Sequence, residues 1–255
     1  MANLFDLTGR RALITGSSRG IGRELARGLA QHGASVVVHG RDAGTLDHVR
    51  KDIAARTGAD VAAITFDVTD ADQVDAAIDR LERDGGPIDI LVNNAGIQRR
   101  AFFPDFELDD WHDLVATNLT SAFLVGRRVS RGMVERGAGK IINIGSVQSQ
   151  LGRANIAPYA ATKGGIAMLT KGMCADLGPR GIQVNALAPG YFATELTRAL
   201  VDDVDFSRWV SERTPAGRWG RTEELVGTLV YLASGASDFV NGQVIYVDGG
   251  MTAVV

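Results

Sequence analysis

Cysteine is nearly absent from this sequence, with Cys174 the only one among 255 residues. A lone cysteine excludes a disulfide within the chain and is typical of proteins that work in a reducing compartment, so we expect a cytoplasmic protein. Because Cys174 lies in an apolar stretch with helical periodicity, we expect it to be a small packing residue.

An excess of basic charge and a long apolar run are also missing. The chain carries 27 Lys and Arg against 30 Asp and Glu, which predicts no binding of nucleic acid. No apolar run reaches the roughly 20 residues that cross a bilayer, and the first residues lack a basic segment followed by an apolar one, so we expect neither a membrane partner nor a secretion signal. The four histidines lack metal-ligand spacing, so we expect no metal, and we place His112 on a helix surface.

What the sequence has is a regular alternation of short apolar runs and helical segments. The runs are nearly continuously apolar, as in parallel strands that are covered on both faces. They are Arg11–Thr15, Ser35–His39, Val61–Phe66, Ile88–Asn93, Lys140–Ile144, Val184–Ala188 and Gln243–Val247. Between two of them, Thr69 and Asp72 predict a capping box at a helix start. The alternation predicts an α/β fold, a Rossmann-type doubly wound sheet of seven parallel strands with helices on both faces, as a single domain.

The first run leads into a glycine-rich loop and then a helix. The spacing G-x-x-x-G-x-G differs from the general dinucleotide fingerprint, but in both patterns glycines let backbone N–H groups approach a pyrophosphate at a helix N-terminus. An ordinary glycine-rich turn is the alternative. We expect a dinucleotide here, bound by Gly16, Ser18, Gly20, Ile21 and Gly22.

The end of the second run indicates which dinucleotide is bound. NAD sites usually place an acid here to hold the ribose hydroxyls, but this chain has Gly40 followed by Arg41. With Arg19, Arg41 forms a guanidinium pair suited to a 2′-phosphate. This favours NADP over NAD; the alternatives are that both arginines are solvated and that Asp42 reaches a ribose.

Two further strand ends carry candidate site residues. Asp67, next to Val68, is placed to accept a hydrogen bond from an adenine amine. After the fourth run, the small residues Asn94, Ala95 and Gly96 mark a place where backbone comes close to a ligand. Two arginines, Arg99 and Arg100, follow at once, and we expect at least one of them to meet an anion.

The fifth run leads to residues that can perform acid–base chemistry. Ser146 follows it, and further along are Tyr159 and Lys163. Pro158 fits the first turn of a helix, so Tyr159 and Lys163 lie one turn apart on one face. An adjacent ammonium and a positive nicotinamide favour the phenolate, and moving the tyrosine pKa from about 10 to about 7–8 takes roughly 3–4 kcal/mol. Tuned in this way, Tyr159 is a candidate acid–base group near neutral pH.

Taken together, these motifs make the chain resemble the short-chain dehydrogenase/reductase family over nearly its whole length. The matching pieces are Thr15–Gly22, Asp67, Asn93–Gly96, Asn118, Ser146, Tyr159, Lys163, Pro189, Gly190 and Thr194. The resemblance implies a catalytic tetrad of Asn118, Ser146, Tyr159 and Lys163. Asn118 then anchors a water, Lys163 holds the nicotinamide ribose, and Pro189 to Thr194 lie beside the nicotinamide.

The resemblance also implies a homotetramer without metal. We expect the cofactor-binding part in about 1–145 and the catalytic and substrate part in about 146–255 of the single domain 1–255.

Within the family, stretches such as NAGIQRR and PGYFATEL most resemble the gluconate 5-dehydrogenases, which interconvert D-gluconate and 5-keto-D-gluconate. Such a sugar acid has one carboxylate and a row of hydroxyls. The resemblance implies that Arg99 or Arg100 pairs with the carboxylate and that Gln148 or Arg153 adds hydrogen bonds. Ser146 and Tyr159 then hold the reacting oxygen.

Two other functions stay open from the sequence. A 3-oxoacyl-[acyl-carrier-protein] reductase shares the tetrad and the cofactor but needs an apolar channel and a basic surface for its carrier. A non-catalytic cofactor-binding sensor is disfavoured, because nothing structural requires the serine, tyrosine and lysine together. Trp209 and Trp219 flank the variable region after Thr194, where such folds carry a mobile segment over the substrate. Both a role in that segment and core packing fit them.

Overall fold

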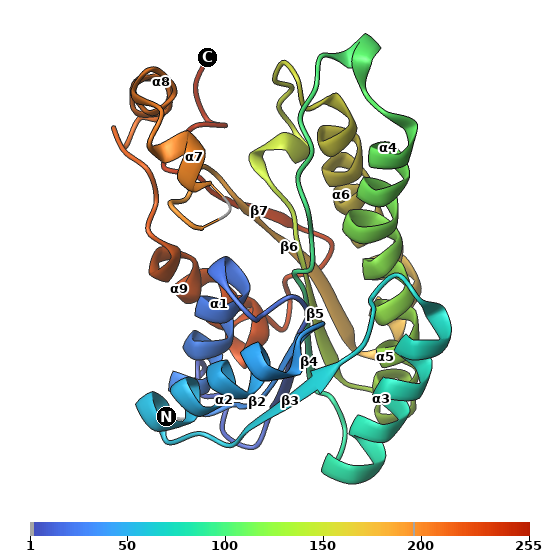
Figure 1. The fold of residues 1–255 in the computed structure, drawn as a ribbon. Helices are drawn as coiled ribbons and strands as arrows, with labels where there is room; N and C mark the ends of the chain where they lie inside the picture. The colour runs from blue at the N-terminus through green and yellow to red at the C-terminus, as the bar shows by residue number, and fades with distance from the viewer. Residues whose placement is uncertain (1–2, 196) are drawn as a thin grey trace.

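Seven parallel strands form one sheet in the computed structural model, which describes residues 3–195 and 197–255 (Figure 1). Their order across the sheet is β3-β2-β1-β4-β5-β6-β7. The strands are β1 (Arg11–Ile14), β2 (Ser35–Gly40), β3 (Val61–Thr65), β4 (Ile90–Asn93), β5 (Gly139–Ile144), β6 (Ile182–Pro189) and β7 (Val244–Val247). All seven predicted runs are strands, so the α/β prediction is confirmed, with ends shifted by a residue or two.

Helices cover both faces of the sheet (Figure 1). One face carries α1 (Gly20–Gln31), α2 (Ala43–Thr57) and α9 (Val226–Ala233); the other carries α3 (Ala71–Gly85), α4 (Leu108–Val115), α5 (Ser121–Arg136) and α6 (Ala157–Leu177). The alternation of side chains along a strand explains the two layers. Leu13 of β1 is buried in the cluster beneath α3 and α5, and Ile14 is buried in the cluster beneath α1 and α9.

Short segments complete the chain around these layers. Beyond the carboxyl end of the sheet lie α7 (Arg198–Val201) and α8 (Val204–Arg213) (Figure 1). Single 3₁₀ turns span Phe103–Asp105, Val147–Ser149, Gly178–Arg180, Thr222–Leu225 and Gly235–Ser237, and a π-helical turn spans Ala116–Thr120. None of the helices in the described part of the chain has the length and apolarity needed to cross a bilayer.

The start of α3 corrects one prediction. The capping residue is Asp70, whose Oδ1 accepts from the backbone N–H groups of Asp72 and Gln73, both at 3.0 Å. The Thr69 hydroxyl instead donates to Asp67 at 2.7 Å. A carboxylate is a stronger acceptor for orphan N–H groups than a hydroxyl, so the predicted Thr69–Asp72 capping box was wrong.

A buried polar chain fixes α6 against the sheet. Asn93 at the end of β4 donates to Asn143 of β5 at 2.9 Å, and Asn143 donates to Thr170 of α6 at 2.9 Å. Pro158 stands in the first turn of α6 as predicted. Further along this helix, Cys174 is partly buried against the apolar cluster, which confirms its packing role. At Thr170, α6 is thereby held against the carboxyl ends of β4 and β5.

Candidate active site

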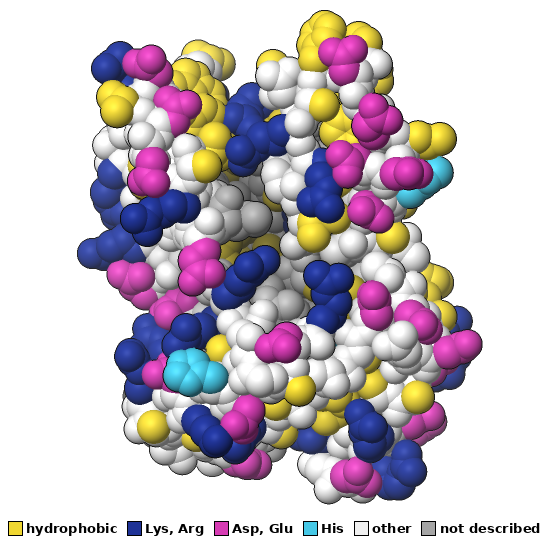
Figure 2. Space-filling model, in the orientation of Figure 1, with side chains coloured by type: hydrophobic (Ala, Val, Ile, Leu, Met, Phe, Trp, Pro, Cys, Tyr) yellow, Lys and Arg dark blue, Asp and Glu magenta, His cyan; other side chains and the backbone are white. Residues whose placement is uncertain are grey.

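A cleft of about 570 Å³ opens at the carboxyl ends of the strands, where doubly wound sheets bind ligands. Figure 2 shows the hollow with basic side chains along both of its sides. Nearly all the predicted site residues line it, from both halves of the chain: Gly16, Ser18, Arg19, Gly20, Ile21, Gly22, Gly40, Arg41, Asp67, Val68, Asn94, Ala95, Gly96, Arg99, Arg100, Ser146, Gln148, Arg153, Tyr159, Lys163, Pro189, Gly190 and Thr194. Asn118 is the exception.

The glycine loop has the geometry of a cradle for a ligand. Gly16 and Gly20 have φ values of +63° and +55°, in the left-handed region that favours glycine. A Cβ on Gly16 would lie 2.9 Å from the Cα of Ala95, whereas one on Gly20 would meet nothing within 4 Å. The loop therefore packs closely against the β4 turn on one side and leaves open space at the N-terminus of α1.

Hydrogen bonds hold the β4 turn against this loop. The Asn94 amide donates to the carbonyl oxygens of Thr15 and Gly16 at 2.9 and 3.0 Å. The Thr15 hydroxyl accepts from the backbone N–H groups of Asn94 and Ala95 at 3.0 and 3.1 Å. The ends of β1 and β4 therefore form one rigid floor.

The two arginines predicted to bind a 2′-phosphate lie at the same cleft. Arg19 and Arg41 both line the cleft, and neither forms an ion pair with another of the described residues. Hydrogen bonds from Thr69, with a smaller effect of the Arg41 charge, lower the pKa of the Asp67 carboxyl. Asp67 is therefore an ionised acceptor at this end of the cleft.

His39, on β2, belongs to the same wall and was not predicted as a site residue. Its side chain is 3% exposed. The Gly16 N–H donates to Nδ1 at 3.0 Å, and Nε2 donates to the Phe66 carbonyl at 3.0 Å. Burial lowers the pKa of His39 to about 4, so the ring is neutral at pH 7. The sequence shows only a histidine at a strand end, because both partners come from the loops that follow β1 and β3.

Ser146, Tyr159 and Lys163 come together at the centre of the cleft. The Ser146 hydroxyl donates to Gln148 Oε1 at 2.5 Å. Lys163 Nζ donates to the Ile144 carbonyl at 2.8 Å and lies 5.7 Å from the ring centroid of Tyr159. The predicted constellation of serine, tyrosine and lysine is thus present in space.

Burial dominates the pKa of Tyr159 in the protein by itself. Burial raises the pKa of the phenol, and the nearby Ser146 hydroxyl and the Arg100 charge lower it by less. Burial also lowers the pKa of Lys163 to about 8. In the protein by itself, desolvation of the phenolate outweighs the surrounding charges. The expected depression of the tyrosine pKa also involves the positive charge of a bound nicotinamide, so it stays a prediction for the cofactor complex.

Asn118 lies in the π-helical turn between α4 and α5, a kind of turn that is frequent at functional sites. Its side chain is 2% exposed. Oδ1 accepts from the Ile97 N–H at 2.8 Å, and Nδ2 donates to the Ile97 carbonyl at 3.0 Å. The amide thus holds the segment after the β4 turn, and it does not open into the cleft.

The two arginines after that turn differ in their partners. Arg99 Nε donates to Asp110 at 2.9 Å, and Asp113 lies 3.8 Å from the same guanidinium. Arg100 has no acidic partner among the described residues; burial and the Arg153 charge lower its pKa. Arg153 stacks over Phe206 at 5.0 Å. Arg100 and Arg153 are therefore neighbouring cations, each without a counter-ion in the described part of the chain.

An aromatic cluster from the variable region borders these arginines. Tyr191 packs edge-on against Phe206, Trp209 and Trp219, each at 5.7 Å between ring centroids. Trp219 Nε1 donates to the Ser207 hydroxyl at 3.2 Å. The tryptophans thus pack on the segment beside the cleft, and neither belongs to the buried core beneath the sheet.

Comparison with known proteins gives the family. A family model described as enoyl-(acyl carrier protein) reductase matches residues 16–252. Gluconate 5-dehydrogenase of Gluconobacter oxydans is 57% identical over 98% of this chain and 97% of its own length. The 5-keto-D-gluconate 5-reductase of Escherichia coli is 51% identical over the full length of both chains.

The solved structures agree with the sequences. A gluconate 5-dehydrogenase from Burkholderia cenocepacia, in complex with NADP and tartrate, is 58% identical, with a TM-score of 0.97 over 99% of this chain and 98% of that one. This chain belongs to the short-chain dehydrogenase/reductase family. It is an oxidoreductase.

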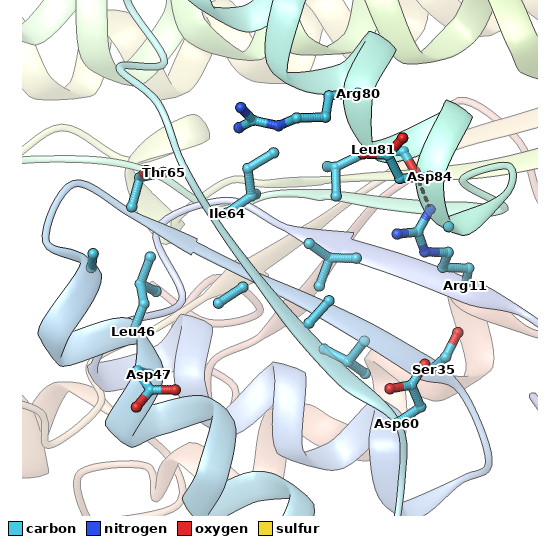
Figure 3. A pocket seen from close by; sticks show the side chains of 16 residues that line it. Arg11, Ser35, Leu46, Asp47, Asp60, Ile64, Thr65, Arg80, Leu81 and Asp84 are labelled. Atoms are coloured by element: carbon cyan, nitrogen blue, oxygen red, sulfur yellow. Dashed lines mark hydrogen bonds between the residues drawn. The ribbon is translucent and has the colours of Figure 1, made fainter.

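A second groove of this short-chain dehydrogenase/reductase lies at the open edge of the sheet, along β3. Figure 3 shows Leu46 of α2 on one side of β3, and Arg80 and Leu81 of α3 on the other. Arg11 in this groove is already bonded, donating to the Leu81 carbonyl at 2.8 Å. The described lining has no histidine, tyrosine, cysteine or lysine. Its described titratable side chains are Arg11, Arg80 and the carboxylates Asp47, Asp60 and Asp84, so the groove has no counterpart of the Ser146–Tyr159–Lys163 cluster.

Protonation of His39 gives a testable pH dependence of stability. Its pKa falls from 6.5 to about 4 on folding, so between these values the unfolded chain binds a proton that the folded chain does not. The free energy of unfolding should therefore decrease as the pH falls through this window, by up to about 3 kcal/mol from this residue. His39→Asn should flatten the dependence of Tm on pH between 6.5 and 4. Equal slopes in the variant and the unmodified protein would contradict this origin.

Proposed function

We propose that this protein is an NADP-dependent oxidoreductase that interconverts D-gluconate and 5-keto-D-gluconate. The observation that carries the proposal is the pairing of a Ser146–Tyr159–Lys163 centre with two arginines, Arg100 and Arg153, that lack counter-ions in the described chain. Relatives named for this reaction are 51–57% identical over nearly the whole chain.

The glycine cradle fits a dinucleotide. Gly20 leaves open space at the N-terminus of α1, where backbone N–H groups and the helix dipole favour a pyrophosphate. Arg19 and Arg41 are assigned to the 2′-phosphate, Asp67 to the adenine amine, and Lys163 to the nicotinamide ribose. When bound, the cofactor supplies the hydride, and the protein supplies position and electrostatics.

Tyr159 is assigned as the proton donor to the substrate oxygen during reduction and as the acceptor during oxidation. Ser146 is assigned to hold that oxygen beside it. In the protein by itself the Ser146 hydroxyl donates to Gln148 at 2.5 Å, so binding exchanges the Gln148 acceptor for the substrate oxygen. Gln148 is then free to bond a neighbouring hydroxyl of the substrate.

Lys163 is assigned to stabilise the phenolate form of Tyr159. Its ammonium lies over the tyrosine ring and has no carboxylate partner among the described residues. Asn118 is assigned to this proton path as a positioning residue, since its amide holds the Ile97 backbone. Because both polar atoms of the Asn118 side chain already bond to Ile97, the water that we expect at this residue would bind its backbone.

The carboxylate of the sugar acid is assigned to Arg100, with Arg153 adding a second contact. Arg99 is the weaker candidate, because Asp110 and Asp113 already neutralise it. A pocket with two cations and the polar groups of Gln148 and Tyr191 suits a sugar acid better than an apolar acyl chain. NADPH oxidation with 5-keto-D-gluconate, set beside an acetoacetyl thioester, tests the choice: faster turnover of the thioester favours an acyl reductase, and no turnover of either favours a sensor.

The remaining expectations are also proposals. We propose a cytoplasmic homotetramer, with cofactor binding in about 1–145 and the substrate part in about 146–255. Exposed apolar side chains on three helices support self-association: Trp111 on α4, Phe123 on α5 and Met168 on α6 are 37%, 49% and 64% exposed. Light scattering of the purified protein measures the assembly directly.

The first prediction concerns the proton donor. Tyr159→Phe keeps the ring and removes the transferable proton, so kcat should fall by roughly 10²–10⁴-fold. NADPH binding, followed by fluorescence, should persist. Tyr246→Phe, outside the cleft, is the matched control. A Tyr159→Phe enzyme with near-normal kcat rejects the mechanism.

The second prediction concerns the choice of cofactor. Arg41→Ala should weaken NADPH by about 2 kcal/mol, roughly 30-fold, as for a lost charged hydrogen bond. NADH should bind almost unchanged, and Arg23→Ala, on α1 and paired with Asp52, should change neither. Equal losses for both cofactors would assign Arg41 a structural role, and a strong preference of the unmodified enzyme for NADH would refute NADP.

The third prediction separates the adjacent arginines. Arg100→Ala should reduce kcat/KM for 5-keto-D-gluconate by about 2 kcal/mol, roughly 30-fold, and should matter much less for an uncharged ketose such as fructose. Arg99→Ala is the matched control, and we expect it to change kcat/KM by less than about threefold, because surface ion pairs contribute little. If Arg99→Ala alone separates charged from neutral substrates, the assignment is reversed.

A further inference from the structure

His39 stands between the two parts of the proposed cofactor wall and has no role in the function assigned above. It lies at the end of β2, directly before Gly40 and Arg41. Its Nδ1 accepts from Gly16 and its Nε2 donates to Phe66. Because Nδ1 faces an N–H donor and Nε2 faces a carbonyl acceptor, the ring is the neutral tautomer with its proton on Nε2.

The backbone of His39 binds the glycine loop as well. Its carbonyl accepts from the Ser17 N–H at 2.9 Å, and its N–H donates to the Ser17 hydroxyl at 2.9 Å. That hydroxyl in turn donates to the Ile14 carbonyl at 2.8 Å. One residue of β2 thus makes three hydrogen bonds to the first two loop residues, Gly16 and Ser17.

The other side of the imidazole meets the end of β3. The rings of His39 and Phe66 lie 4.1 Å apart between centroids, inclined at 46°. Phe66 directly precedes Asp67 and Val68, which line the cleft. The imidazole therefore spans from the loop assigned to the pyrophosphate to the wall assigned to the adenine.

We propose that His39 is a positioning residue for the adenosine half of the dinucleotide. The side chain fixes the backbone of Gly16, and with it the glycine loop, and the Phe66–Val68 wall before the cofactor arrives, which removes an ordering cost from binding. This inference rests on the proposed NADP function. Because His39 does not touch Ser146 or Tyr159, its effect falls on cofactor affinity and leaves kcat at saturating cofactor unchanged.

Three variants separate the two contacts of the ring. Asn places an amide oxygen near the position of Nδ1, Gln places an amide near the position of Nε2, and Leu provides neither. The probes are NADPH and its fragment 2′,5′-ADP, and the measurements are dissociation constants by fluorescence and by calorimetry. His32→Asn, at the end of α1 and outside the cleft, is the matched control.

We expect His39→Leu and His39→Gln to weaken both probes by about tenfold or more, since each leaves the Gly16 N–H unpaired. His39→Asn should bind both probes within about threefold of the unmodified protein. If His39 acted only by filling space, His39→Asn should bind worst of the three variants, because Asn fills the core less well than Leu or Gln.

Several results overturn the inference. Unchanged affinity in all three variants does so, and so does an equal loss in all three that follows their loss of Tm. A fall in kcat at saturating NADPH with unchanged affinity also rejects it. If the unmodified protein binds neither probe, the proposed NADP function fails first, and the inference fails with it.

Discussion

The cleft depends on a buried cation, Lys163, that has no counter-ion among the described residues. Lys163 is 6% exposed, its ammonium donates to the Ile144 carbonyl at 2.8 Å, and no carboxylate of the described chain pairs with it. Burial lowers its pKa to about 8 and raises the pKa of the neighbouring Tyr159. Each charge alone is penalised by desolvation, but an ammonium and a phenolate formed together stabilise each other. The protonation of Tyr159, and with it the proton transfer proposed there, therefore depends on where Lys163 is held.

The ends of the parallel strands hold the cleft in its shape. Parallel strands end at one edge, so the loops that follow β1, β2, β4 and β5 meet without any ladder to join them. Polar side chains take the place of that ladder: Thr15 and Asn94 join the first and fourth strands, His39 joins the second and third, and Asn118 secures the segment beyond. These contacts leave the backbone N–H groups of the loops in fixed directions, as an anion site requires.

The sequence predicts the sheet well, because a strand covered on both faces is nearly continuously apolar, and each of the seven runs is rich in apolar residues. The sequence predicts side-chain contacts less well, because the partner of a side chain often lies far away in the chain. Asp70 displaces Thr69 as the cap of α3 because its carboxylate is the better acceptor. Arg99 and Arg100 are indistinguishable in sequence, and only the packing of α4 shows that Asp110 and Asp113 neutralise the first. His39 carries no local signal at all, since its side-chain partners lie in the loops after two other strands.

The same electrostatic reasoning extends to the proposed substrate. Arg100 and Arg153 lie close enough for the charge of one to lower the pKa of the other, so the protein by itself bears the cost of their repulsion. A carboxylate bound between them removes that repulsion and gains two charge-assisted contacts. A neutral ketose gains neither, and an acyl chain leaves both guanidiniums to be desolvated without an anion, which is costly. In the proposed function, the repulsion between Arg100 and Arg153 thus favours an acidic substrate, while Ser146 and Tyr159 contact only the oxygen that reacts.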